Sequence, residues 1–246
     1  MLQLSKLGLY TTSRRVFFGM FLVLVANLTP VARAASINIL PIRVCDDAGL
    51  MCGNDAGELF LAETNKIWAQ AGLTFNYLPF TSINSTAFLN LDDQAEVDLF
   101  FNTAPGGAAN PLTISMWFVG SIFDAFGEAN AIPGNKVVID QLVFTVGRLD
   151  TIAHEVGHLL GLQHDDPGVE TDFLMRSGDD RITPTTIDDI TPDGAALDKL
   201  TAAQIATALA DPKVLTAVPE PATFATMLCG LGVLGLVFRR RKASRV

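Results

Sequence analysis

The amino-acid sequence predicts one α/β (α+β) domain, in which most strands of a mixed sheet precede two helices. Residues 35–45 in the first part of the body alternate like a strand, and 73–80 and 136–140 also have strand character. Apolar residues at helical spacing then occupy 150–161 and 197–212. This order of elements, together with their number, indicates a single sheet-and-helix domain.

The first three elements of the body are defined by their pattern and their ends. Residues 35–45, ASINILPIRVC, alternate like a first strand. Residues 57–72 carry apolar side chains at helical spacing, and Gly72 is a typical helix stop. Residues 73–80, LTFNYLPF, follow as a second strand.

Further strands are predicted before the histidine-rich segment. Residues 95–104 form a third strand that ends at a glycine-rich turn, and 113–123 are another apolar segment with strand character. Residues 127–132 predict a short strand, 133–135 (Pro-Gly-Asn) a turn, and 136–140 the last strand. The helix at 197–212 closes with an Asp-Pro pair.

The N-terminal 34 residues have the pattern of a secretory signal peptide. Basic residues precede the apolar run 16–28, and Ala32 and Ala34 supply an A-x-A cleavage site. A retained anchor helix is the alternative, for which the apolar run is short. We predict three regions: a signal peptide at 1–34, a catalytic domain at 35–217 and a sorting signal at 218–246.

The C-terminal region has three parts in a fixed order. Pro219, Glu220 and Pro221 precede sixteen mostly apolar residues, Thr223–Phe238, and a basic cluster follows at 239–242. Sixteen helical residues reach about 24 Å, which predicts a short transmembrane segment against a hydrocarbon core of about 30 Å. This pattern resembles the PEP-CTERM sorting signal of Gram-negative bacteria. The resemblance implies export to the cell surface, a transient membrane tether and cleavage by an exosortase-type enzyme, and a permanent anchor is the alternative.

The body of the chain is strongly acidic. All 26 acidic residues but only eight of the 17 basic residues lie between 35 and 221, which gives this region a net charge of −18. Such a surface repels phosphate groups, and it therefore excludes nucleic acid as a partner.

All three histidines of the chain lie in the stretch HEVGHLLGLQH, residues 154–164. His154 and His158 are four residues apart, so a helix presents both imidazoles on one face, and Asp150 or Thr151 is a candidate N-cap for that helix. Gly161 can adopt the left-handed conformation that ends the helix and returns His164 to the same point. A catalytic Zn²⁺ site needs three protein ligands, here three imidazoles, and a fourth coordination position that is open to water.

Glu155 directly follows the first of these histidines. Zinc lowers the pKa of a bound water to about 7, and a neighbouring carboxylate can take the proton of that water and return it to a leaving amine. We therefore predict Glu155 as the general base of a hydrolase.

The complete pattern HExxHxxGxxH resembles the motif of metzincin zinc endopeptidases at each of its five fixed positions. Residues 172–178, DFLMRSG, follow at the distance of the family's Met-turn, with Met175 as the apolar floor below the ligands. The resemblance implies a twisted mixed sheet with an active-site helix, a Met-turn and a C-terminal helix. It also implies that 127–132 form the strand that borders the cleft and that the loop 177–190 walls a substrate pocket.

The branch of the family stays open between two resemblances. Asp165 after the third histidine is similar to the reprolysin-like branch, in which that aspartate braces the Met-turn. Residues 63–75 are similar to matrixin-like domains. No tyrosine follows Tyr77, which excludes the tyrosine switch of astacins and serralysins.

Two further features concern ions and thiols. Cys45 and Cys52 are expected to form a disulfide after export, and a thiolate that blocks the zinc is the alternative. Six aspartates could supply ligands for a Ca²⁺ ion, whereas a solvated acidic surface is the interpretation that we favour for them. They are Asp165, Asp166, Asp179, Asp180, Asp188 and Asp189.

The sequence thus predicts a secreted zinc-dependent metalloendopeptidase that cleaves a protein or peptide substrate. The alternative is a non-catalytic extracellular matrix or adhesion protein that keeps the same fold. Glu155 argues against that alternative, because a purely structural metal site has no use for a carboxylate beside an open coordination position.

Overall fold

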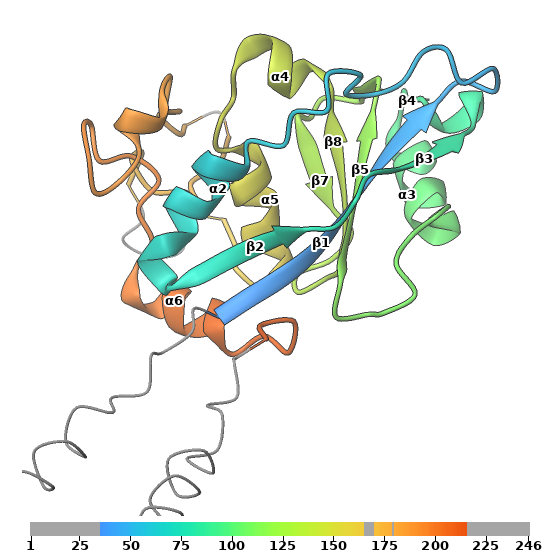
Figure 1. Cartoon of the computed structure of the whole chain (residues 1–246). Coiled ribbons are helices and arrows are strands. Elements are labelled where there is room, and N and C mark those ends of the chain that lie inside the picture. The colour runs from blue at the N-terminus through green and yellow to red at the C-terminus, as the bar shows by residue number, and fades with distance from the viewer. Residues whose placement is uncertain (1–34, 165–169, 179, 216–246) are drawn as a thin grey trace, which may run out of the picture. The chain divides into compact units, whose positions relative to one another are not determined.

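The computed structural model describes residues 35–164, 170–178 and 180–215, which belong to one compact unit. Its strands in the main sheet are β1 (Ala35–Cys45), β2 (Leu73–Tyr77), β3 (Thr81–Asn84), β5 (Ile114–Val119), β7 (Gly127–Ala129) and β8 (Lys136–Asp140). They form a six-stranded sheet in the order β2-β1-β5-β8-β7, with β3 also paired to β1 (Figure 1). A separate parallel pair joins β4 (Asn90–Leu91) to β6 (Ser121–Ile122).

All neighbours in the main sheet are parallel except one. β7 pairs with β8 in the antiparallel direction, and β7 ends the strand order, so it is an edge strand. β2 and β3 pair one after the other with the first and second halves of β1. The prediction of a mixed-sheet α/β fold is confirmed, and the strand expected at 127–132 lies at the sheet edge.

Helices cover both faces of this sheet. They are α2 (Leu61–Trp68), α3 (Gln94–Thr103), α4 (Leu142–Val146), α5 (Thr151–Leu159) and α6 (Ala202–Leu209), with 3₁₀ turns η1 (Ala69–Ala71), η2 (Thr86–Phe88) and η3 (Ile187–Asp189). Side chains from α2 and α5 share one core cluster, whereas those from α3 belong to a second cluster. The helix α4, between β8 and α5, was not predicted.

The central strand β5 contributes to both cores. Its residues Ile114, Met116 and Phe118 belong to the cluster that also contains α2 and α5. Trp117 and Val119 point to the cluster that contains α3. Because successive side chains of a strand alternate between faces, a strand covered on both sides is apolar throughout, and all six residues of β5 are buried.

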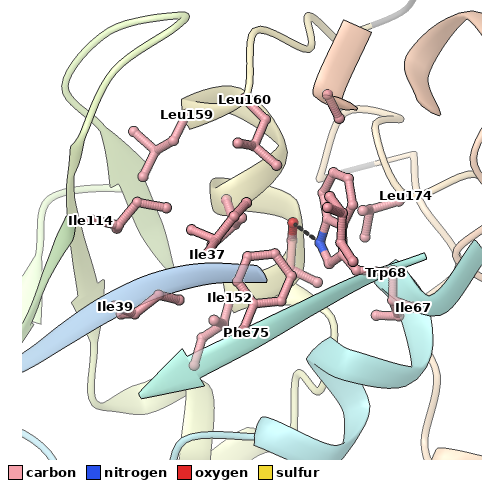
Figure 2. Close-up of a cluster of buried hydrophobic side chains, with 14 of the residues drawn as sticks. Ile37, Ile39, Ile67, Trp68, Phe75, Ile114, Ile152, Leu159, Leu160 and Leu174 are labelled. Atoms are coloured by element: carbon pink, nitrogen blue, oxygen red, sulfur yellow. Dashed lines mark hydrogen bonds between the residues drawn. The ribbon is translucent and has the colours of Figure 1, made fainter. Parts of the chain in front are cut away.

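Trp68 connects α2 to the helix that carries two of the histidines. Figure 2 shows its indole among Ile67, Phe75 and Leu174, with the Nε1–H group donating to the carbonyl of Ala153 at 3.2 Å. Ala153 lies directly before His154 in α5. The core therefore fixes the position of the histidine-bearing helix relative to the sheet.

The predicted strand at 95–104 is wrong, because this segment forms the helix α3. Asp93 caps the helix by accepting a hydrogen bond from the Glu96 amide at 2.9 Å, and Glu96 accepts from the Asp92 amide at 2.7 Å. Val97 and Phe100 are buried at helical spacing. The segment VDLFF mimics alternation over a few residues, whereas the cap before it favours a helix.

Other boundaries shift for identifiable reasons. The helix predicted from 57 begins at Leu61, because Gly57 and Phe60 have φ values of 72° and 42°, which are not helical. Gly72 ends the helical segment as expected, with φ at 65°. The last helix begins after Thr201, whose side chain caps it, since residues before Thr201 form bridges to other segments.

The prediction of a transmembrane segment is wrong. No helix in the described part of the chain combines the length and the hydropathy needed to cross a bilayer. Thr223–Phe238, where we placed the segment, lie outside the described residues. The signal peptide at 1–34 also lies outside the described residues, and the domain boundaries stay predictions.

Candidate metal centre

The histidine cluster (His154, His158 and His164) is assembled by one helix and one turn. His154 and His158 lie on the same face of α5, with ring centroids 4.8 Å apart. Gly161 has φ at 91°, and Leu162 bonds back to the carbonyl of Gly157 at 3.0 Å, so the chain reverses after the helix. His164 Nε2 then lies 2.9 Å from the Nε2 atoms of both other histidines.

A backbone carbonyl assigns the proton of one of these histidines. His158 Nδ1 faces the carbonyl of Leu162 at 2.8 Å, and a carbonyl only accepts, so this Nδ1 donates its hydrogen and Nε2 keeps a free lone pair. This is the tautomer that coordinates a metal through Nε2. His154 Nδ1 lies 2.6 Å from the Leu174 carbonyl, an acceptor, and 2.5 Å from Arg181 Nη1, a donor, so these contacts do not assign its tautomer.

Burial keeps both of these imidazoles uncharged. It lowers the pKa of His154 well below the usual value, and the Arg181 charge lowers it further. Burial is also the main cause that lowers the pKa of His158 to about 4, although the bond to Leu162 opposes this shift. Neutral imidazoles are the form that a metal ion requires.

A metal ion fits the arrangement of these nitrogen atoms. The candidate ligand atoms of the three rings lie within 4.8 Å of one another, and His164 Nε2 lies 2.9 Å from Nε2 of both other histidines. Lone pairs of imidazole nitrogens this close repel one another unless a proton or a cation lies among them. Three imidazoles suit a divalent transition metal such as zinc, copper, nickel or iron. Among the described residues this is the one group of three or more candidate ligands.

Glu155 lies beside the cluster and is 7% exposed. Burial raises the pKa of its carboxyl group to about 8, the Arg181 charge opposes that shift, and the Glu128 charge adds to it. The edge strand β7 packs closely on this side chain, because a Cβ atom at Gly127 would lie only 2.8 Å from Glu155 Cγ. The carboxylate is thus confined between α5 and the edge of the sheet.

Met175 lies directly under the helix that carries the ligands. It is fully buried, and a Cβ atom added at Gly157 would overlap its sulfur. The backbone next to it is fixed to a distant segment, since Leu174 donates to the carbonyl of Lys199 at 3.0 Å. Gly157, between two histidines, is therefore the position at which helix and methionine make their closest approach.

Arg181 joins this turn to the start of α5. Its Nε donates to Asp150 Oδ2 at 2.6 Å, and the two side chains are 2% and 0% exposed. Its Nη1 donates to the carbonyls of Leu174 and Arg176 at 3.2 and 3.1 Å. Of Asp150 and Thr151, the two N-cap candidates, Asp150 is the N-cap residue of α5, but its carboxylate binds Arg181 instead of a helical amide.

A cavity of about 540 Å³ opens next to the histidine cluster. His154, Glu155 and His164 form one side of it. The start of β7, the residues after β8 and Ser177 and Gly178 after the Met175 turn contribute the other sides. Its size is in the range of small-ligand and side-chain pockets.

Sequence reasoning located the histidines, Glu155, Gly161 and Met175, and the structure brings them to one place. Asp165 lies outside the described residues, as do Asp166 and Asp179, and the described part of the chain gives the Ca²⁺ site no support. Sequence reasoning missed Arg181, Arg148 and the contact of Gly127 with Glu155. No local pattern marks them, because their partners lie far along the chain.

The two cysteines of the body are bonded to each other. Cys45 and Cys52 form a disulfide that closes the loop after β1. Neither sulfur is thus a free thiolate that could reach the histidine cluster.

Comparison with protein families finds one match. Residues 217–242 match the PEP-CTERM protein-sorting motif. The motif indicates export and association with the surface of a Gram-negative bacterium. No curated protein matches the chain.

Solved structures that resemble the chain do so weakly. One is metalloproteinase-II from Bacteroides fragilis, with 17% identity over 74% of this chain and 54% of that chain, at a TM-score of 0.41. Archaemetzincin from Methanopyrus kandleri has 14% identity over 62% of this chain and 90% of that chain, with a TM-score of 0.38. A chaperone–substrate complex has 13% identity over 72% of this chain and 33% of that chain, with a TM-score of 0.39. The chain thus spans about half the length of the first, and similarity at this level assigns neither a family nor a branch.

Proposed function

We propose that this protein is an exported zinc-dependent metalloendopeptidase. The observation that supports it best is the set of three converging imidazoles, one of them held in the metal-binding tautomer by a backbone carbonyl, with the Glu155 carboxyl group beside them. A structural metal site is closed by four protein ligands, whereas the described residues of this site offer three and border a cavity.

In this proposal His154, His158 and His164 hold the zinc ion. When bound, zinc supplies a Lewis acid and makes water a nucleophile near neutral pH. The raised pKa of the Glu155 carboxyl group would be lowered by the positive charge of a bound zinc ion, so that its carboxylate could take a proton from the attacking water and return it to the leaving amine. Its confinement against Gly127 keeps the carboxylate on the cavity side of α5.

The edge strand β7 is the proposed docking site for the substrate backbone. One side of β7 pairs with β8, and the strand order ends there, so the other side is free to bond an extended peptide. Glu155 lies directly against this strand. A peptide added to β7 would therefore pass across the catalytic carboxylate and place a side chain in the cavity.

The resemblance to metzincins is extended here only residue by residue. Met175 takes the place of the Met-turn residue, and its sulfur lies against Gly157 between two ligands. The reprolysin-like and matrixin-like branches stay open. We further propose that an exosortase-type enzyme processes the chain at its sorting motif, in agreement with the match at 217–242.

The test compares the full chain with Glu155→Ala. Both proteins are analysed for bound metal and incubated with a mixture of unfolded proteins, and new peptide termini are sequenced. We expect one zinc ion in each protein and cleavage by the wild type alone. Glu63→Ala, on helix α2 and outside the lining of the cavity, is the matched control and should cleave like the wild type.

Two outcomes would overturn the proposal. Zinc in both proteins with no cleavage by either would favour a non-catalytic matrix or adhesion protein. Equal cleavage by wild type and Glu155→Ala would show that the hydrolysis comes from another group or a contaminant.

A further inference from the structure

Arg148 is a cation in the cavity that has no carboxylate partner among the described residues. It lines the same cavity as His154 and Glu155. Its guanidinium carbon lies 4.5 Å from the centroid of the Phe126 ring, a cation–π contact that fixes its plane. Nη2 donates a long bond of 3.4 Å to the carbonyl of Gly178, and the buried Nε has no acceptor.

This lack of a partner is unusual in so acidic a body. Of its eight basic side chains, five form ion pairs with aspartates in the described part of the chain. Arg43 and Lys136 also lack a carboxylate partner there, but neither lines the cavity. The pairs are Lys66–Asp193, Arg176–Asp180, Arg181–Asp150, Lys199–Asp172 and Lys213–Asp211.

The acidic groups of the cavity are engaged elsewhere or lie in solvent. Asp140 accepts from the backbone amides of Ile122 and Leu142 at 2.9 and 2.7 Å, one for each carboxylate oxygen. Glu155 faces the histidine cluster. Asp124 lines the cavity but is exposed to solvent. Arg181, the other cation of the cavity, is committed to Asp150.

We propose that this cavity accepts an acidic side chain of the substrate, from a residue next to the cleaved bond, and that Arg148 selects it. This inference rests on the proposed function. Arg148 lines the cavity, its guanidinium carbon lies 4.5 Å from the centroid of the Phe126 ring, and a guanidinium can bind a carboxylate through two hydrogen bonds. A neutral side chain leaves these donors unpaired, and a lysine is repelled.

The test uses two series of peptides. One series varies the residue directly before the cleaved bond and the other varies the residue directly after it, and in each series that residue is Glu, Gln or Lys. The zinc-loaded full chain should cleave the best-placed Glu peptide with a kcat/KM at least about tenfold above that of its Gln counterpart. Arg148→Met should bring this ratio close to one, and Arg148→Glu should favour Lys over Glu. The ratio, rather than the absolute rate, is the readout, and zinc content is measured in each protein.

Arg43→Met is the matched control. Arg43 also stacks on an aromatic ring, with its guanidinium carbon 4.5 Å from the Phe80 centroid, and its buried Nε also lacks an acceptor. The variant loses the same charge outside the cavity. The Glu-to-Gln ratio should therefore stay at the wild-type value, which separates the local effect of Arg148 from that of net charge.

Two results would overturn the inference: a wild-type ratio near one at both positions, or a preference for Glu that survives in Arg148→Met. A binding measurement separates its failure from that of the proposed function. Glu155→Ala loaded with zinc should bind the Glu peptide more tightly than the Gln peptide, whether or not any variant cleaves it. Equal binding of the two peptides by this protein would contradict acid selection by the cavity.

Discussion

The ion pair of Arg181 and Asp150 lies next to His154, and Arg181→Met tests how the metal centre is supported. The two side chains are 2% and 0% exposed, and Nε lies 2.6 Å from Oδ2. Removal of one partner from a buried pair typically costs about 3–5 kcal/mol, because the remaining charge has neither water nor a partner. The substitution also takes a donor from the carbonyls of Leu174 and Arg176. We expect the free energy of unfolding to fall by about 4 kcal/mol, or Tm by about 8–16 °C.

Urea denaturation followed by tryptophan fluorescence measures this loss, since the only two tryptophans, Trp68 and Trp117, are both fully buried. The double variant Asp150→Asn/Arg181→Met should regain about half of the loss, because it leaves neither partner of the pair charged. Arg176→Met is the matched control. The Arg176 and Asp180 side chains of this pair are 30% and 59% exposed, so we expect the free energy of unfolding to fall by less than about 1 kcal/mol.

The reasoning would be refuted by a loss below about 1 kcal/mol in Arg181→Met. A double variant no more stable than the single one would also refute it, since the cost would then come from lost packing rather than from an unpaired charge. Zinc affinity is a second readout. Arg181 Nη1 contacts both His154 Nδ1 and the Leu174 carbonyl beside it, so its loss releases the His154 ring, and affinity should fall about 10–100-fold.

Three further predictions concern protonation, close packing and the metal. Burial and the nearby Asp150 charge raise the pKa of Asp198 to about 8, so the folded protein binds a proton that the unfolded chain releases above about pH 4. Relative to Asp198→Asn, wild-type stability should fall as pH rises from about 4 to 8, by up to about 1.4 kcal/mol per unit, and urea melts showing a pH-independent difference would contradict this. Gly127→Ala should keep its zinc but lose at least about tenfold in peptide cleavage, because the new Cβ lies 2.8 Å from Glu155 Cγ; wild-type rates would show that the carboxylate tolerates displacement. A chelator should lower the apparent Tm by about 8–16 °C, the effect of losing about 4 kcal/mol of binding stabilisation, and His158→Gln should show no such zinc-dependent shift in thermal melts.

The parts of the fold that were predictable carry their signal within a few residues. β1 alternates, β8 is a short apolar run that follows a Pro-Gly-Asn turn, and Gly72 ends a helical segment with the positive φ that glycine favours. α3 was misread because VDLFF begins with the apolar–polar–apolar alternation of a strand. Its true signal, the cap by Asp93, lies just before the apolar pattern.

The site divides in the same way. The histidines, Glu155 and Gly161 are close in sequence, so a single helix and turn predict their arrangement. Arg181 and Asp150 are 31 residues apart, and Gly127 meets Glu155 only because β7 lies at the sheet edge beside α5. Such contacts depend on how the elements pack, which the sequence pattern does not encode locally.

The metal centre therefore depends on two segments of the chain: the helix and turn that carry the histidines, and a distant segment, 172–199, that packs against them. Helix geometry and the Gly161 turn place all three ring systems, and the turn also supplies the Leu162 carbonyl that orients His158. His154 Nδ1 faces the Leu174 carbonyl and Arg181. The Leu174 amide donates to the Lys199 carbonyl, and the Leu174 carbonyl accepts from Arg181. A chain with an intact histidine motif can thus lose a correctly oriented ligand through changes at 172–199 alone. Substitutions in that segment should weaken the site even though they leave each ligand in place.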